Sequence, residues 1–200
     1  NRNKLGNTKG YVFMIPPKKQ QEDPYVQLAR NTIEEYVCTG SIRKVPEGLP
    51  QEMYETQAGV FVSIKIRDGR HGDSGQTLRL RGCIGTIAAV QSCVAEEIIQ
   101  NAVSASTLDP RFSPITQAEL DQLTISVDVL GSMEKISSLD QLDVRRYGVV
   151  VTKGYRRGLL LPNLEGVDTV SDQVAIAKRK AGIGEAESVE LERFEVVRHE

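Results

Sequence analysis

The sequence lacks several residue types and patterns that would assign it to a specialised class of protein. It has no tryptophan and two histidines among 200 residues. Its three cysteines, Cys38, Cys83 and Cys93, form no Cys-x-x-Cys pair and are too few and too scattered for a disulfide framework. A reducing, cytoplasmic setting is therefore expected. No apolar run approaches the roughly 18 residues that a membrane-spanning helix needs, so we expect a soluble globular protein.

The familiar catalytic and nucleotide-binding motifs are also absent from the sequence. We find no Gly-x-Ser-x-Gly elbow, Walker A loop, Gly-x-Gly-x-x-Gly fingerprint, His-Glu-x-x-His pair or EF-hand loop. A zinc site made of His71, Cys83 and Cys93 would match no established ligand spacing, and we predict no metal site. The sequence does not identify a cofactor.

Neither sign of charge dominates the chain. There are 25 Lys and Arg residues against 27 Asp and Glu residues, a formal net charge of −2. Nucleic-acid-binding domains are usually basic, so RNA or nucleotide binding is the least favoured function for this chain. It would depend on two arginine pairs, at residues 145–146 and 156–157, which are more typical of solvated turns.

The chain divides into a short arm and one domain. Residues 1–21 are rich in Asn, Lys, Gly and Pro, and they predict a linker or N-terminal arm. Because no initiator Met is present, this arm could be the junction of a larger fusion protein. Residues 22–200 carry the periodic hydrophobic patterns expected of a folded domain.

Helix signals occur at four places along this domain. Asp23 as N-cap, Pro24 in the first turn and Gly40 past the end predict a helix over 24–39. Small and apolar residues at helical spacing predict another over 92–106. A capping box is expected at residues 116–119, and Thr169 is expected to cap a helix that ends at Gly182.

Strand signals alternate with the helices. Residues 60–66 and 78–85 predict one hairpin, residues 149–152 and 159–161 predict another that turns at Gly154, and residues 189–197 predict a final strand. Helices and strands in mixed order, with two hairpins, favour an α+β fold with mainly antiparallel strands.

The most informative segment is Leu-Arg-Gly-Cys-Ile-Gly-Thr at residues 80–86. Glycine within a strand marks a bulge or the close approach of another group, so Gly82 and Gly85 would leave Cys83 open. Strict alternation would place Arg79 and Arg81 on the face of Cys83, where their charge favours the thiolate. The alternative is a buried structural thiol, a common fate of free cysteine.

This segment resembles the signature of the AMMECR family, also called the AmmeMemoRadiSam system protein A family. The likeness covers nearly everything from residue 23 to residue 200. It includes Pro-Tyr-Val-Gln-Leu-Ala-Arg at 24–30, Gly-Val-Phe-Val-Ser at 59–63, Asp-Pro-Arg-Phe at 109–112, Tyr-Gly-Val-Val-Val at 147–151, Arg-Gly-Leu-Leu-Leu-Pro at 157–162 and Lys-Ala-Gly-Ile at 180–183.

The resemblance implies a fold of two α+β subdomains with the segment around Cys83 near a groove between them. It also implies two partners, a Memo-like, dioxygenase-related protein and a radical SAM protein, and in some relatives a Memo-like domain precedes this one in a single chain. It supplies no established reaction, so whether the chain is an enzyme stays open.

We therefore expect an accessory or catalytic component of this system that binds a small molecule or peptide in the groove. Cys83 is the candidate nucleophile or attachment point, Arg81 would stabilise negative charge, and Asp109 could accept a proton. Further ligand-binding candidates are Arg79, Gly82, Ile84, Gly85, Thr86, Arg111 and Phe112. Two bland alternatives remain for this set: a turn with a surface salt bridge at Asp109, and a non-catalytic protein-interaction module.

Overall fold

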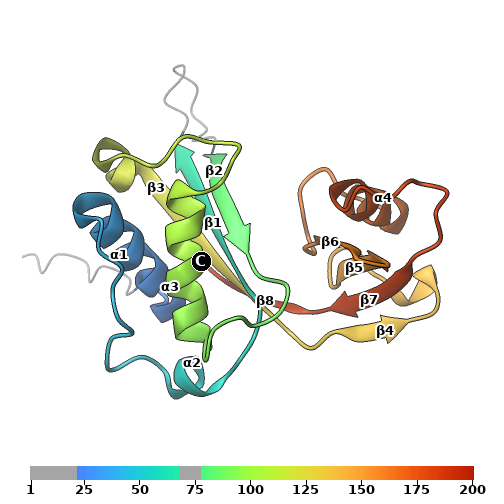
Figure 1. The fold of residues 1–200 in the computed structure, drawn as a ribbon, viewed down its shortest axis with the longest axis horizontal. Helices are drawn as coiled ribbons and strands as arrows, with labels where there is room; N and C mark the ends of the chain where they lie inside the picture. Colours follow the sequence, from blue (N-terminus) through green and yellow to red (C-terminus); the bar gives the residue numbers. More distant parts are fainter. Residues whose placement is uncertain (1–21, 68–77) are drawn as a thin grey trace, which may run out of the picture.

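The chain folds into two four-stranded antiparallel sheets, each with its own helices (Figure 1). The computed structural model describes residues 22–67 and 78–200. The predicted arm and most of the loop between the first two strands lie outside the described residues. The expected α+β fold with antiparallel strands is confirmed.

The first sheet has the strand order β2-β1-β3-β8. Its core lies between one face of the sheet and two helices, α1 and α3, where apolar side chains of β1 and β3 alternate with more exposed ones. Its elements are α1 (Pro24–Thr39), α2 (Gln51–Glu55), β1 (Val60–Arg67), β2 (Leu78–Gly85), α3 (Val94–Thr107), η1 (Gln117–Gln122), β3 (Leu123–Leu130) and β8 (Val196–His199).

The predicted start and end of α1 are confirmed. The carboxylate of Asp23 accepts the backbone N–H of Tyr25 at 2.9 Å, and Pro24 takes the first helical position. Gly40 follows the helix in the left-handed region with φ 73°, which favours glycine.

The second sheet has the strand order β4-β7-β5-β6, and α4 packs on β5 and β6. Thr169 caps α4 through the backbone N–H of Asp172, and the predicted hairpin turns at Gly154 with φ 59°. Its elements are β4 (Glu134–Ile136), η2 (Leu139–Gln141), β5 (Gly148–Lys153), β6 (Arg156–Leu160), α4 (Val170–Lys180) and β7 (Glu190–Phe194).

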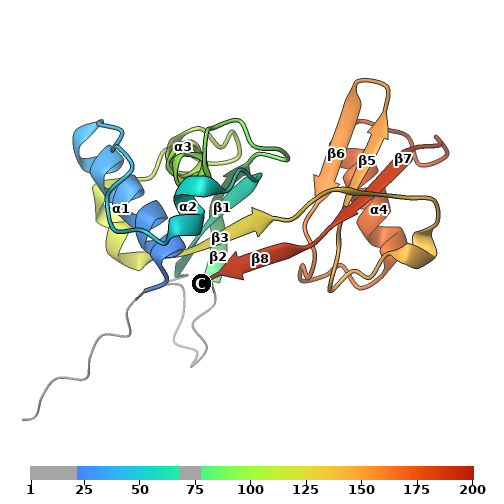
Figure 2. The same ribbon diagram turned by 90° about the horizontal axis from the view of Figure 1, so that it is seen from below.

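Each sheet with its helices forms one half of the molecule: the sheet β2-β1-β3-β8 belongs to the first half and the sheet β4-β7-β5-β6 to the second. Two chain segments join these halves. One leads from β3 to β4, and the other from β7 to β8 (Figure 2). The sequence predicted a single strand over 189–197, but the chain changes sheets at Glu195, whose carbonyl accepts the N–H of Gly131 at 2.8 Å. The prediction was wrong because both parts have the same strand pattern, and only their pairing partners separate them.

A small apolar cluster fills the space between the two sheets. Its buried members are Leu130, Val150, Leu159, Leu161 and Phe194. Part-buried side chains of the first half, including Phe61 and Ile87, pack against it. Within the described residues, no helix is long and apolar enough to cross a membrane.

Candidate functional site

A cavity of about 230 Å³ lies where the two halves meet. Its floor is the face of the first sheet that does not carry α1 and α3, and its other wall comes from β6, the segment after it, and the end of α4. Its lining residues are Phe61, Ser63, Lys65, Leu80, Cys83, Arg111, Ser126, Leu159, Leu160, Leu161, Leu164, Lys180 and Arg198.

Cys83 lies on β2 with its thiol at this cavity. It pairs with Ser63 of β1, which in turn pairs with Ser126 of β3, so three small polar side chains form a row across the sheet. The hydroxyl of Ser63 donates to Sγ of Cys83 at 3.2 Å. The backbone groups of Cys83 point away from β1, an arrangement that brings the two side chains close together.

Asp109 and Arg111 cover the free edge of β2 at Cys83. The Asp109 carboxylate accepts the Cys83 N–H at 2.9 Å, and Arg111 donates to the Cys83 carbonyl at 3.3 Å. Asp109 also accepts the backbone N–H of Arg111 at 3.1 Å and two guanidinium bonds at 2.9 and 2.7 Å. These side chains therefore satisfy the backbone N–H and carbonyl of Cys83, which a neighbouring strand would otherwise bind.

The same contacts decide the ionisation of Asp109. Its side chain is 3% exposed, and the Arg111 guanidinium, with help from the two backbone N–H groups, holds the pKa of that carboxyl well below its usual range despite burial. A carboxylate this firmly ionised is a poor proton acceptor at neutral pH. The geometry favours the turn and salt-bridge interpretation of Asp109.

Arg81 does not line the cavity. A register irregularity at Ile64/Lys65 breaks the alternation of β2, so the expectation that Arg81 shares the face of Cys83 is wrong. Its buried guanidinium binds both carboxylate oxygens of Glu119, at 2.8 and 3.2 Å, and the carbonyls of Ser113 and Pro114. The pKa of Glu119 falls to about 2, chiefly because of this pairing.

Arg79 lies on the other side of that irregularity. Arg79 pairs with Ile66, whose side chain is part of the core beneath α1 and α3. Arg79 itself is exposed to solvent. The cations that act on the Cys83 thiol are therefore Arg111 and Lys180 in place of the two arginines expected from the sequence, and Lys65 and Arg198 also line the cavity.

The thiol of Cys83 differs from the sequence prediction in its acidity. Burial raises its pKa above the usual value, and this outweighs the opposing effects of the Ser63 hydrogen bond and the positive charges of Arg111 and Lys180. The negative charge of Asp128 adds to the increase. At neutral pH Cys83 is mainly a thiol.

The two glycines beside Cys83 do not open it to solvent. A Cβ on Gly82 would overlap the backbone carbonyl of Ala105 in α3, and one on Gly85 would overlap the Phe61 ring. Each glycine admits a close neighbour.

The remaining candidates lie around this strand. Ile84 is half-buried against the first core, and Phe112 is half-buried below the Arg111 guanidinium, which lies 5.4 Å from its ring centre. Thr86 donates to Glu97 at 2.7 Å. Glu97, itself buried, also accepts the N–H of Val90, so Thr86 belongs to a network that holds the following loop.

Sequence reasoning missed five polar residues of the cavity wall: Ser63, Lys65, Ser126, Lys180 and Arg198. Lys180 is the last residue of α4 and is exposed as a whole, but partial desolvation of its ammonium, with the like charge of Arg111, lowers its pKa. Arg198 binds the buried Asp128 at 2.7 and 3.1 Å. A signal for Lys180 existed, because it opens the motif Lys-Ala-Gly-Ile, but a charged helix end has a sufficient explanation in the helix dipole.

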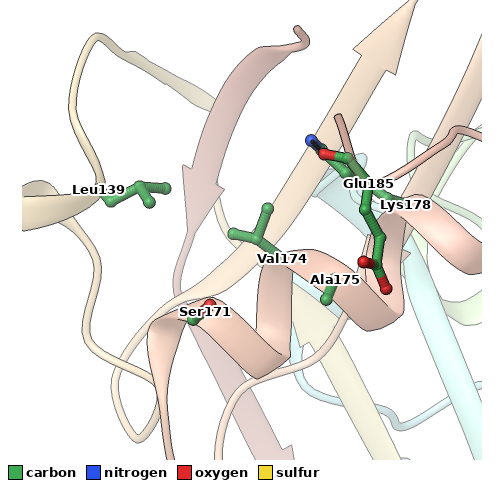
Figure 3. Close-up of a pocket in the computed structure, with 6 residues that line it drawn as sticks. All are labelled: Leu139, Ser171, Val174, Ala175, Lys178 and Glu185. Carbon is green, nitrogen blue, oxygen red and sulfur yellow. Dashed lines mark hydrogen bonds between the residues drawn. The ribbon is translucent and has the colours of Figure 1, made fainter. Parts of the chain in front are cut away.

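A second hollow runs along α4 and measures about 400 Å³ (Figure 3). Leu139, Val174 and Ala175 line it, together with Lys178, whose ammonium donates to the carbonyls of Glu185 and Glu187 at 2.8 and 2.7 Å. Lys178 thus holds the loop after α4. The hollow offers no thiol or paired cations, so we do not regard it as the functional site.

Metal-ligating side chains do not gather at either place. Among residues 22–67 and 78–200, no group of three His, Cys, Asp or Glu side chains could hold a metal ion. His71 lies outside the described residues.

Curated relatives cover most of this chain. A Thermotoga maritima protein is 45% identical over 179 residues, which are 89% of this chain and 98% of that protein. A Clostridium acetobutylicum protein is 47% identical over 183 residues, 91% of this chain. This chain spans only 37% of that longer relative.

A solved structure and a family model match as well. The crystal structure of the uncharacterised protein PH0010 from Pyrococcus horikoshii superposes with a TM-score of 0.77 and 32% identity, over 87% of this chain and 88% of that one. The family model described as AMMECR1 matches residues 26–199. From these matches, and from the fold that they share, the chain belongs to the AMMECR1 family.

Proposed function

We propose that this chain binds a small molecule in the cavity beside Cys83. The observation that carries the proposal is the convergence of a thiol, its hydroxyl partner Ser63 and the cations Arg111 and Lys180 in one largely apolar cavity. Small-molecule sites typically combine apolar walls with a few placed polar groups.

Within this proposal Cys83 is the nucleophile or the attachment point for the ligand. The role of stabilising negative charge passes from Arg81 to Arg111 and Lys180, because the Arg81 guanidinium is already bound to Glu119. Since the resting thiol is largely protonated, a reaction at Cys83 would begin with transfer of its proton to a base on the ligand, a partner or water.

The system in which the chain acts is also a proposal. We expect a Memo-like protein and a radical SAM protein as partners, on the strength of the resemblance of the sequence motifs. The chain would be their accessory or catalytic component.

A non-catalytic interaction module is the second candidate. It is favoured by the raised pKa of Cys83 and by the hydrogen bonds that already occupy the Asp109 carboxylate, because neither of the two predicted catalytic groups is then activated. In this case the same cavity would hold a partner's peptide tail.

Native mass spectrometry of the full chain, isolated from its cells, separates the two candidates. We expect a bound metabolite or an adduct on Cys83, absent from Ser126→Phe, which fills the cavity, and retained by Ser132→Phe, which adds the same bulk at an exposed position outside it. If Ser126→Phe still carries the small molecule, or if the wild type carries none, the proposal is contradicted. A peptide segment lost on Ser126→Phe would favour the interaction module.

A further inference from the structure

We propose that the ligand of this cavity is a small organic acid, held by its carboxylate at Lys180 and Arg111 and by a short hydrocarbon part at the leucine wall. This inference rests on the proposed function and names the chemical class of its ligand.

Lys180 is the first observation. Its side chain reaches the cavity from the end of α4 beside Cys83 and Arg111. Among the residues that the structure describes, no acidic side chain forms an ion pair with it. The residue as a whole is exposed, but partial desolvation of its ammonium and the like charge of Arg111 both lower its pKa. An anion placed between the two cations would offset both effects.

The charge balance of the lining is the second observation. Four cations line the cavity and no described lining residue is acidic. Arg111 is bound to Asp109 and Arg198 to Asp128, both behind the wall. The lining therefore carries more positive than negative charge even after these pairs are counted, and a negatively charged ligand group is favoured.

Arg111 has limited capacity left for such a group. Its Nε and Nη2 donate to Asp109, and Nη2 also reaches the Cys83 carbonyl. Within the described residues, Nη1 has no hydrogen-bond partner, and the side chain is 55% exposed. One guanidinium nitrogen and one ammonium match the two oxygens of a carboxylate, whereas a phosphate would leave its third oxygen without either donor.

The side of the cavity that faces the first sheet is mainly apolar. Its wall consists of Leu159, Leu160, Leu161 and Leu164, opposite Phe61 and Leu80. These side chains offer no donors or acceptors and favour a hydrocarbon group. The volume of about 230 Å³ is below the roughly 300–1,000 Å³ of drug-sized sites, which favours a small acid over a nucleotide cofactor.

Binding of matched six-carbon probes to the full chain tests the charge requirement. We would titrate hexanoate, hexanamide, hexylammonium and hexyl phosphate and follow them by NMR. We expect hexanoate to bind at least about tenfold more tightly than each of the others, because its two oxygens match the two donors that remain, Nη1 of Arg111 and the ammonium of Lys180. Among butanoate, hexanoate and octanoate, affinity should rise up to about fourfold per methylene until the cavity is full.

Variants of one helix turn test the anchor. Lys180→Met should weaken hexanoate binding about tenfold, and Lys180→Arg should retain most of it. Arg179→Met is the matched control: it removes one positive charge from the same turn at a residue that is exposed like Lys180 but lies outside the lining, and it should leave binding unchanged.

The outcomes distinguish this inference from the proposed function. If hexanamide binds as tightly as hexanoate, or if hexylammonium or hexyl phosphate binds more tightly, the ligand is not a carboxylic acid. The proposed binding of a small molecule in the cavity still stands in that case, provided that Ser126→Phe abolishes binding of the probe. An equal loss in Arg179→Met would show that general charge, and not the cavity, attracts the anion. If no probe binds and native spectra of the wild type contain no small molecule, both the inference and the proposed function fail. The probe comparison in the wild type does not depend on any variant folding.

Discussion

At the scale of single residues, the three cysteines differ in exposure. Cys38 is exposed, Cys83 is half-buried and Cys93 is buried. Because burial also raises the pKa of the Cys83 thiol, we expect iodoacetamide at neutral pH to label Cys38 first, Cys83 more slowly and Cys93 last. The labelling rate of Cys83 should keep rising as the pH increases beyond the usual thiol range. Peptide mapping after timed labelling measures all three rates.

Ser63→Ala tests how far the Ser63 hydrogen bond controls the acidity of the Cys83 thiol. The Ser63 hydrogen bond lowers the pKa of Cys83, so its removal should slow labelling of Cys83 at fixed pH and leave the rate of Cys38 unchanged. Labelling of Cys83 ahead of Cys38 would mean that Arg111 and Lys180 outweigh burial.

Asp109 gives a second prediction, on stability. Asp109→Asn removes a buried charge that accepts four hydrogen bonds, and it should lower the free energy of unfolding by about 2–3 kcal/mol at neutral pH. The folded pKa of this carboxyl is depressed, so its contribution is present above the unfolded value of about 3.9 and lost as the pH falls below it.

Urea unfolding of both proteins between pH 3 and pH 7 measures this difference. It should be constant above about pH 5 and shrink below about pH 4. Asp121→Asn, at an exposed carboxylate, is the control and should cost less than about 0.5 kcal/mol. A pH-independent difference for Asp109→Asn would attribute the loss to packing and not to charge.

At the scale of elements, local sequence signals predict most of the fold. The caps Asp23, Gly40 and Thr169 and the turn at Gly154 use chemistry that acts within a few residues, and all are found as predicted. Features that depend on which strands pair with one another cannot be predicted from local sequence. The irregularity that turns Arg81 away from Cys83 arises in the pairing of β2 with β1, and the division at Glu195 arises because the two parts join different sheets.

The candidate site divides in the same way. Cys83 could be singled out from the sequence because its neighbours break the rules of a strand. Lys180 and Arg198 could not, since about a hundred residues separate them from Cys83 and only the assembly of the two halves brings them to one cavity.

Gly82 carries the prediction at this scale. A methyl group there meets the backbone of α3 at Ala105, which cannot move aside without shifting the helix. We expect Gly82→Ala to destabilise the protein by about 2–3 kcal/mol. Gly184→Ala is the matched control, because its nearest neighbour at 3.3 Å is a side chain, the Glu187 carboxylate, which has to move by only a few tenths of an ångström, and it should cost less than about 1 kcal/mol. Equal midpoints of chemical unfolding for the two variants would contradict this account of the packing.

At the scale of the whole molecule, the distribution of charge bears on RNA binding. Three of the four arginines in the candidate basic pairs bind carboxylates: Arg146 to Glu195, Arg156 to Glu187 and Arg157 to Glu192, at 2.7, 2.8 and 2.9 Å. We therefore expect no RNA binding that weakens with salt in fluorescence anisotropy at physiological ionic strength. Micromolar binding that disappears on reversing the charge of Arg156 and Arg157 would refute this.

The cavity depends on how firmly the two halves are joined. Only two chain segments link them, so their coupling depends on the cluster around Phe194, which is 1% exposed and packs with Leu130 of the first half and Val150 of the second. We expect Phe194→Ala to cost about 3–5 kcal/mol and to split thermal unfolding into two transitions, because it removes the shared contacts while each half keeps its own core.

Calorimetry tests this coupling with a variant confined to one half. Ile183→Ala removes a buried side chain from the core of the second half and should lower the melting temperature while keeping one transition. If Phe194→Ala also unfolds in one transition with equal calorimetric and van't Hoff enthalpies, the halves are coupled elsewhere. The next contacts to test would then be the other members of this cluster and the hydrogen bond between Gly131 and Glu195, which joins the two linking segments.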